Sequence, residues 1–203
     1  MLVTDNADFR AVRNWITRAK VQLFAARERR LWRFKLRSTY AQGCQCSFVS
    51  AENALRSQLA EACLRHVAKG RLNAFSCGMP GRLAHAVSPI ALEVLHRAGM
   101  PIAHLKPKSW DVFKAAGAPR MDYVISLDEQ MASEHPAWPS QPELALWCYP
   151  PLLWTLTPVP DRERKAEQVL LSLQRRIEFL VSLQAKVAHR SELRGDLRDL
   201  AHI

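Results

Sequence analysis

Short apolar runs alternate with amphipathic stretches along the middle of the chain. The runs Cys44–Val49 and Leu72–Cys77 have the length of buried strands. Residues 54–69, between them, place apolar side chains on one face at helical spacing: Leu55, Leu59, Ala62, Cys63 and Val67. Strands that alternate with helices predict a parallel sheet covered by helices on both faces.

The pattern continues toward the C-terminus. It predicts helices over residues 89–99 and 110–116 and strands over residues 121–127 and 144–149. A long final helix is expected to begin around Asp161, after several prolines, with a packed stripe of Leu170, Leu173, Ile177 and Leu180. The sequence therefore predicts a small α/β sandwich with about four parallel strands.

Basic charge is concentrated at the N-terminus. Residues 1–43 hold ten lysines and arginines against three acidic residues, so they carry +7 of the net charge of +10. Apolar and aromatic residues alternate with these charges, and no Gly or Pro interrupts residues 8–42, which predicts an amphipathic helix. Such a helix can pack on protein, lie on an anionic membrane, or contact nucleic-acid phosphates. We favour packing, because most amphipathic helices bury their apolar stripe on protein.

Length and composition limit the class of protein. With 203 residues, the chain suits one well-buried domain with extensions. We expect a basic helical extension over residues 1–41, a core over 42–187 and a mixed-charge tail over 188–203. The sequence contains neither a membrane-spanning stretch nor a secretory signal, and its five cysteines lack C-x-x-C spacing. We therefore expect a cytoplasmic protein with free thiols.

The segment after the first predicted strand resembles a known phosphate loop. It reads S-A-E-N-A-L-R-S-Q-L-A-E-A from Ser50 to Ala62, where the low-molecular-weight protein tyrosine phosphatases and related arsenate reductases have C-x5-R-S, often followed by Q-M-A-E-A. Further matches follow in family order: Ser76 and Gly78, Pro89 to Val94, Gly99, Lys108 to Asp111, and Met121 to Ile125. The resemblance covers about residues 44–185. It implies a flavodoxin-like, phosphotyrosine phosphatase I-like three-layer sandwich.

Carried over by residue, the resemblance keeps the scaffold and loses the chemistry. Ser50 stands where the family has its nucleophilic cysteine, and a serine hydroxyl stays protonated at neutral pH unless a base removes its proton. Pro151 stands where the phosphatases have the aspartate that protonates the leaving group. We therefore expect neither phosphatase activity nor a catalytic residue.

The arsenate reductases also need two further cysteines. Their positions fall on Asp128 and His135, so the resemblance predicts no reductase activity. The seven histidines are scattered without ligand spacing, and we expect neither a metal nor a cofactor.

What remains is an anion-binding loop made of Ser50, Ala51, Glu52, Asn53, Ala54, Leu55, Arg56 and Ser57. Arg56 can offer a bidentate fork to an oxyanion, Asn53 tolerates the left-handed backbone that such loops need, and Ser57 can donate a hydrogen bond. Equally, Arg56 and Asn53 can serve only to brace the loop, with Leu55 or Glu52 filling the pocket.

The favoured function is that of a catalytically inactive member of the family, a pseudoenzyme that binds phosphate, another oxyanion or a phosphorylated protein. One alternative is an interaction scaffold whose terminal helices form a homodimer or contact a partner protein, with a vestigial pocket. A second alternative is residual tyrosine phosphatase activity. A third and weaker alternative is contact of the basic extension with an anionic membrane. No recognised DNA-reading motif is present, so we expect no sequence-specific nucleic-acid binding.

Overall fold

The computed structural model describes residues 43–149 and 159–187. Four strands form one parallel sheet: β1 (Cys44–Val49), β2 (Leu72–Cys77), β3 (Tyr123–Ser126) and β4 (Glu143–Leu146). Their order is β2-β1-β3-β4, which is the order of a flavodoxin-like doubly wound sheet. The predicted basic extension 1–41, the tail 188–203 and Pro151 lie outside the described residues.

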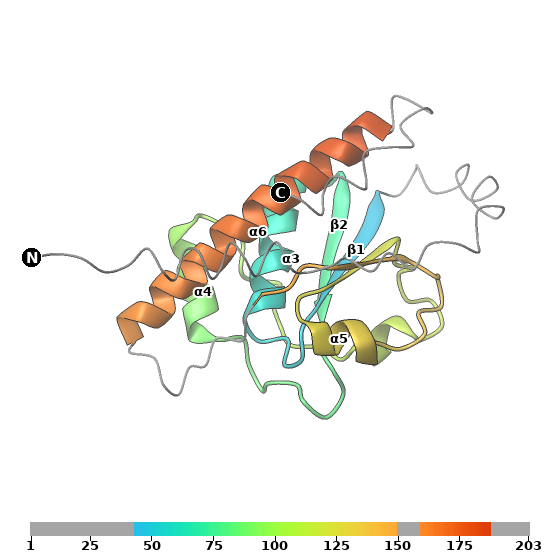
Figure 1. Cartoon of the computed structure of the whole chain (residues 1–203), viewed down its shortest axis with the longest axis horizontal. Helices are drawn as coiled ribbons and strands as arrows, with labels where there is room; N and C mark the ends of the chain where they lie inside the picture. The colour runs from blue at the N-terminus through green and yellow to red at the C-terminus, as the bar shows by residue number, and fades with distance from the viewer. Residues whose placement is uncertain (1–42, 150–158, 188–203) are drawn as a thin grey trace, which may run out of the picture.

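Helices cover both faces of the sheet, as predicted. On one face, α3 (Arg56–Ala68), α4 (Pro89–Arg97) and α6 (Val159–Val187) share a core with Cys46 and Phe48 of β1. Figure 1 shows α6 running diagonally across α3 and α4. On the other face, the short helix α5 (Glu129–Glu134) and the 3-10 turn η1 (Trp110–Phe113) share a second core with Val49 and Val124. The molecule is a three-layer α/β sandwich.

The first two strands have the predicted bounds, but the last two differ. β3 is shorter than the predicted strand 121–127. The apolar pattern extends further than the strand because Met121 and Leu127 are buried just beyond its ends. β4 lies earlier than the predicted 144–149. The apolar run continues past β4 because Trp147 and Tyr149 pack beside α6, where the Arg176 guanidinium lies 5.9 Å and 5.2 Å from their ring centroids.

The two short helical segments begin at side-chain caps. The apolar pattern does not predict α5. Its N-cap residue is Asp128, whose Oδ1 accepts a hydrogen bond of 2.8 Å from the backbone N–H of Met131. The predicted helix 110–116 is instead the four-residue turn η1, capped by Ser109.

The long helix α6 packs as its stripe predicts. Leu170, Leu173, Ile177 and Leu180 are all buried, and the helix contacts α3 and α4. Arg97 of α4 adds ion pairs of 3.1 Å to both Glu163 and Glu167 of α6. Within the described residues, no helix combines the length and the apolar character that crossing a bilayer requires.

Replacing Leu173 with alanine is expected to lower the free energy of unfolding by about 2–5 kcal/mol, because its side chain is fully buried between α6 and the core. Denaturant unfolding measures the change. Leu171→Ala is the matched control: Leu171 is 59% exposed on the same helix, so its replacement should change stability by only about 0.5 kcal/mol. Equal stability of the two variants would contradict the packing of α6.

Candidate functional site

The loop between β1 and α3 is held from outside through its carbonyl groups. Backbone N–H groups of Met79, Ala84 and Ser88 donate to the carbonyls of Ala51, Glu52 and Ala54 at 2.9, 3.0 and 2.9 Å. One neighbouring segment, residues 79–88, therefore fixes the course of the loop.

The N–H groups of the same loop are left without partners. Within the described residues, no backbone N–H from Ala51 to Gln58 donates a hydrogen bond. The N-cap residue of α3, Leu55, gives no side-chain cap, and the first turn of α3 contains no acidic residue. Free N–H groups at an uncapped helix N-terminus have the donor chemistry of an oxyanion site.

Asn53 takes the left-handed conformation that the sequence suggested, with φ of 50°. Its side chain is fully buried and makes three hydrogen bonds. Nδ2 donates to the hydroxyls of Ser57 at 2.8 Å and Ser76 at 2.9 Å, while Oδ1 accepts from the backbone N–H of Lys108 at 2.9 Å. Asn53 thus joins the loop to β2 and to the segment before η1.

Ser50 lies at the start of the loop, where its backbone N–H donates to Cys77 of β2. Its side chain is buried, and its hydroxyl is 2.7 Å from that of Ser57. Within the part of the chain that the structure describes, Ser57 is the only side chain hydrogen-bonded to this hydroxyl. Neither a carboxylate nor an imidazole is placed there to remove its proton.

A buried ion pair lies beneath the loop, and sequence reasoning assigned it no role. Glu61 of α3 accepts a hydrogen bond from Ser76 at 2.5 Å and from the Lys108 ammonium at 2.9 Å. Only 3% of the Glu61 side chain is exposed, so Lys108 compensates a charge that would otherwise be costly to bury. The sequence signal that could have predicted this ion pair is Glu61 itself, a glutamate among the apolar residues of a helix.

The Arg56 guanidinium is engaged away from the loop. Nη1 donates to the carbonyls of Tyr149 at 2.7 Å and Leu127 at 3.3 Å, and Nη2 forms an ion pair of 2.9 Å with Asp128. Arg56 therefore braces the carboxyl ends of β3 and β4. This is the bracing role that sequence analysis set beside anion binding, although the Nε–H donates to no described residue.

The other predicted loop residues are placed as follows. Glu52 is exposed at the surface, Ala54 is half-buried, and Ala51 and Leu55 are buried in the two different cores. Leu55 thus packs beneath the loop as a core residue. Asp128 and His135, at the redox-cysteine positions of the resemblance, lie at the two ends of α5.

The five cysteines are free thiols. Burial raises the pKa of Cys63 and of Cys77 to about 12, and that of Cys46 is raised in the same way. Cys148 follows β4 and is partly exposed; burial and the nearby Glu129 carboxylate raise the pKa of its thiol as well. These thiols stay protonated at neutral pH. Residues 43–149 and 159–187 contain no group of three metal-ligating side chains.

Comparison with known proteins finds a family model that matches the middle of the chain. The family model described as low molecular weight phosphotyrosine protein phosphatase matches residues 45–143. No curated protein sequence matches the chain.

Solved structures share the fold. An arsenate reductase in its phosphate binding state is 24% identical, with a TM-score of 0.53, over 68% of this chain and 97% of that one. YfkJ from Bacillus subtilis is 18% identical, with a TM-score of 0.54, over 71% and 96%. The chain spans 64% of the thioredoxin-dependent arsenate reductase of Corynebacterium glutamicum, with 68% of its own length aligned, 26% identity and a TM-score of 0.48.

The matched segment includes the loop after β1 and reaches the first residue of β4, and the solved structures share the overall fold. Over residues 45–143 the chain is thus similar to the low molecular weight phosphotyrosine protein phosphatases.

Proposed function

We propose that the chain holds a phosphate-like oxyanion, or a phosphorylated side chain of another protein, in the loop Ser50–Ser57 without turning it over. The observation that carries the proposal is the buried hydrogen bond of 2.7 Å between the hydroxyls of Ser50 and Ser57. In the family resemblance, Ser50 stands at the position of the nucleophile, and its hydroxyl has no base beside it among the described residues. The protein would act as a regulatory binding module.

The chemistry of the Ser50 hydroxyl argues against cleavage of a phosphate ester. Attack on phosphorus requires a deprotonated nucleophile, and serine reaches that state only with an adjacent base. The family resemblance also places Pro151 at the general-acid position, and Pro151 can donate no proton to a leaving group. Without either group, the loop can bind the anion but cannot cleave a phosphate ester.

Binding is supported by the donors that the loop leaves free. The unpaired N–H groups from Ala51 to Gln58 and the dipole of the 13-residue helix α3 both favour an anion at this place. The arsenate reductase of the same fold has a phosphate binding state, and we carry that ligand class over to this chain. Arg56 would contribute its free Nε–H while its ion pair with Asp128 stays intact.

Titration with phosphate, arsenate and phosphotyrosine tests this function. Amide resonances of residues 50–57 in NMR spectra should shift saturably at millimolar ligand. Arg56→Ala should weaken binding about tenfold, because it removes a charged donor. Arg97→Ala removes an equal charge between α4 and α6 and is expected to leave the affinity unchanged. Absence of shifts at millimolar ligand would mean that the loop is closed to oxyanions.

The pKa of a cysteine placed at position 50 tests the N–H donors of the loop without a ligand. If the N–H groups stabilise a negative charge there, the thiol of Ser50→Cys should have a pKa below its usual 8.5 or so. Alkylation by iodoacetamide at mildly acidic pH, located by mass spectrometry, should be fast and slowed by phosphate. Ser133→Cys, on the exposed side of α5, provides the control thiol. Equal rates in the two variants, unaffected by phosphate, would refute an anion-stabilising loop.

The engagement of Arg56 also favours a second candidate function. Because Arg56 braces Leu127, Asp128 and Tyr149, the loop has a structural role that needs no ligand. On this hypothesis the pocket is vestigial, and the terminal segments form an interface with a second copy or a partner protein. Deletion of residues 1–41 should then change the oligomeric state measured by light scattering. An unchanged mass would reject self-association through this segment.

A further inference from the structure

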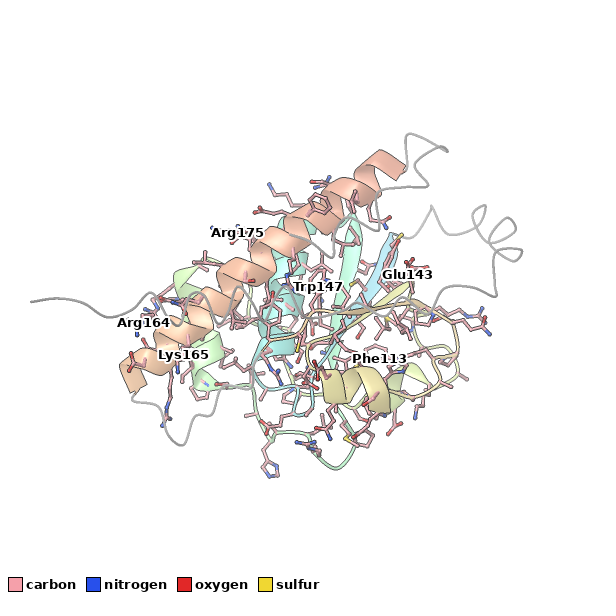
Figure 2. The ribbon with its side chains drawn as sticks, viewed as in Figure 1. Phe113, Glu143, Trp147, Arg164, Lys165 and Arg175 are labelled. Carbon is pink, nitrogen blue, oxygen red and sulfur yellow. The ribbon has the colours of Figure 1, made fainter. Side chains whose placement is uncertain are left out.

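A cavity lies away from the loop Ser50–Ser57. It has a volume of about 200 Å³ and is enclosed by residues 113–121 and 138–140. These segments precede β3 and β4 at their amino ends, whereas Ser50–Ser57 follows the carboxyl end of β1. Phe113, labelled in Figure 2, lies on the α5 side of the sheet. The cavity is therefore separate from the family's phosphate site.

The inner wall of this cavity is aromatic. Phe113 and Trp138 line it and are themselves only 7% and 6% exposed, so neither ring is free to turn away. The outer wall consists of small residues, Ala115, Ala116, Gly117, Ala118 and Pro119. Such a lining suits a flat apolar group of small size.

Hydrogen-bond donors around the cavity lack acceptors. Among the described residues, the indole N–H of Trp138 has no acceptor, and the backbone N–H groups of Ala115, Ala116, Gly117 and Arg120 donate to none. No aspartate or glutamate lines the cavity. A ligand that supplies acceptor oxygens would satisfy groups that the described chain leaves unpaired.

The charge at the cavity is positive. Lys114 is neutralised by Asp111 at 2.7 Å, whereas the exposed Arg120 has neither an ion pair nor a hydrogen bond to any described residue. An uncommitted guanidinium is a natural partner for a carboxylate, which it can bind through two parallel hydrogen bonds. Arg120 therefore supplies the specific contact that the apolar wall cannot.

We propose that this cavity binds a small aromatic carboxylic acid, with its carboxylate on Arg120 and its ring against Phe113 and Trp138. The inference does not depend on the function proposed for Ser50–Ser57. It gives the protein a second ligand class, an organic acid, at the opposite end of the sheet.

Benzoate and its uncharged analogue benzamide test the proposal on the full chain. In NMR titrations at constant ionic strength, benzoate should shift the amides of Ala115, Ala116, Gly117 and Arg120 and the indole N–H of Trp138 saturably. Benzamide should bind about tenfold more weakly, and Arg120→Gln should weaken benzoate binding by a similar factor, because each removes the charged hydrogen bonds.

Lys165→Gln serves as the matched control, since it removes one exposed positive charge on α6. Figure 2 shows Lys165 well away from Phe113 of the cavity. The control substitution should leave benzoate binding unchanged. Equal binding of benzoate and benzamide, no loss in Arg120→Gln, or no saturable shift at millimolar benzoate would each overturn the proposal. Phosphate is expected to shift residues 50–57 only, so failure at one site is distinguishable from failure at the other.

Discussion

The side-chain amide of Asn53 connects three parts of the chain that meet at the loop after β1. It donates to Ser57 and Ser76 and accepts from the backbone of Lys108. Asn53 has the left-handed conformation, and residues 79–88 hold the carbonyls of the loop, while its N–H groups donate to no described residue. The shape of the loop therefore depends on this one buried residue, and so would the anion binding that we propose for it.

Both hydrophobic cores support the loop. Ala51 packs into the core beneath α5 and η1, while Leu55 packs into the core beneath α3, α4 and α6. Arg56 adds a third attachment through Asp128, which also caps α5. A loop attached to both layers and to the strand ends keeps its shape without a ligand, because its position is set by packing. On the function proposed above, this would explain how the scaffold persists with Ser50 in place of a nucleophilic cysteine.

Periodicity predicted the parts of the fold that bury the most apolar surface: β1, β2 and the helices α3, α4 and α6. It failed where few residues are involved. α5 spans six residues, too few for a helical repeat, and its signal is the cap at Asp128. In the site, the backbone of Asn53 was predictable from residue type. The partners of Arg56 were not, because Asp128 lies 72 positions away and only the crossover to β3 brings it close.

These separations also bear on how the molecule folds. β1 and β2 flank α3 and form one local unit, and the contact from Asn53 to Ser76 spans only 23 positions. By contrast, Asn53 and Lys108 are 55 positions apart, and Gln45 and Asp122, where β1 meets the start of β3, are 77 apart. Closing such long chain segments is slow. We therefore expect the loop to form first within the βαβ unit and to take its final shape when the second half of the sheet docks.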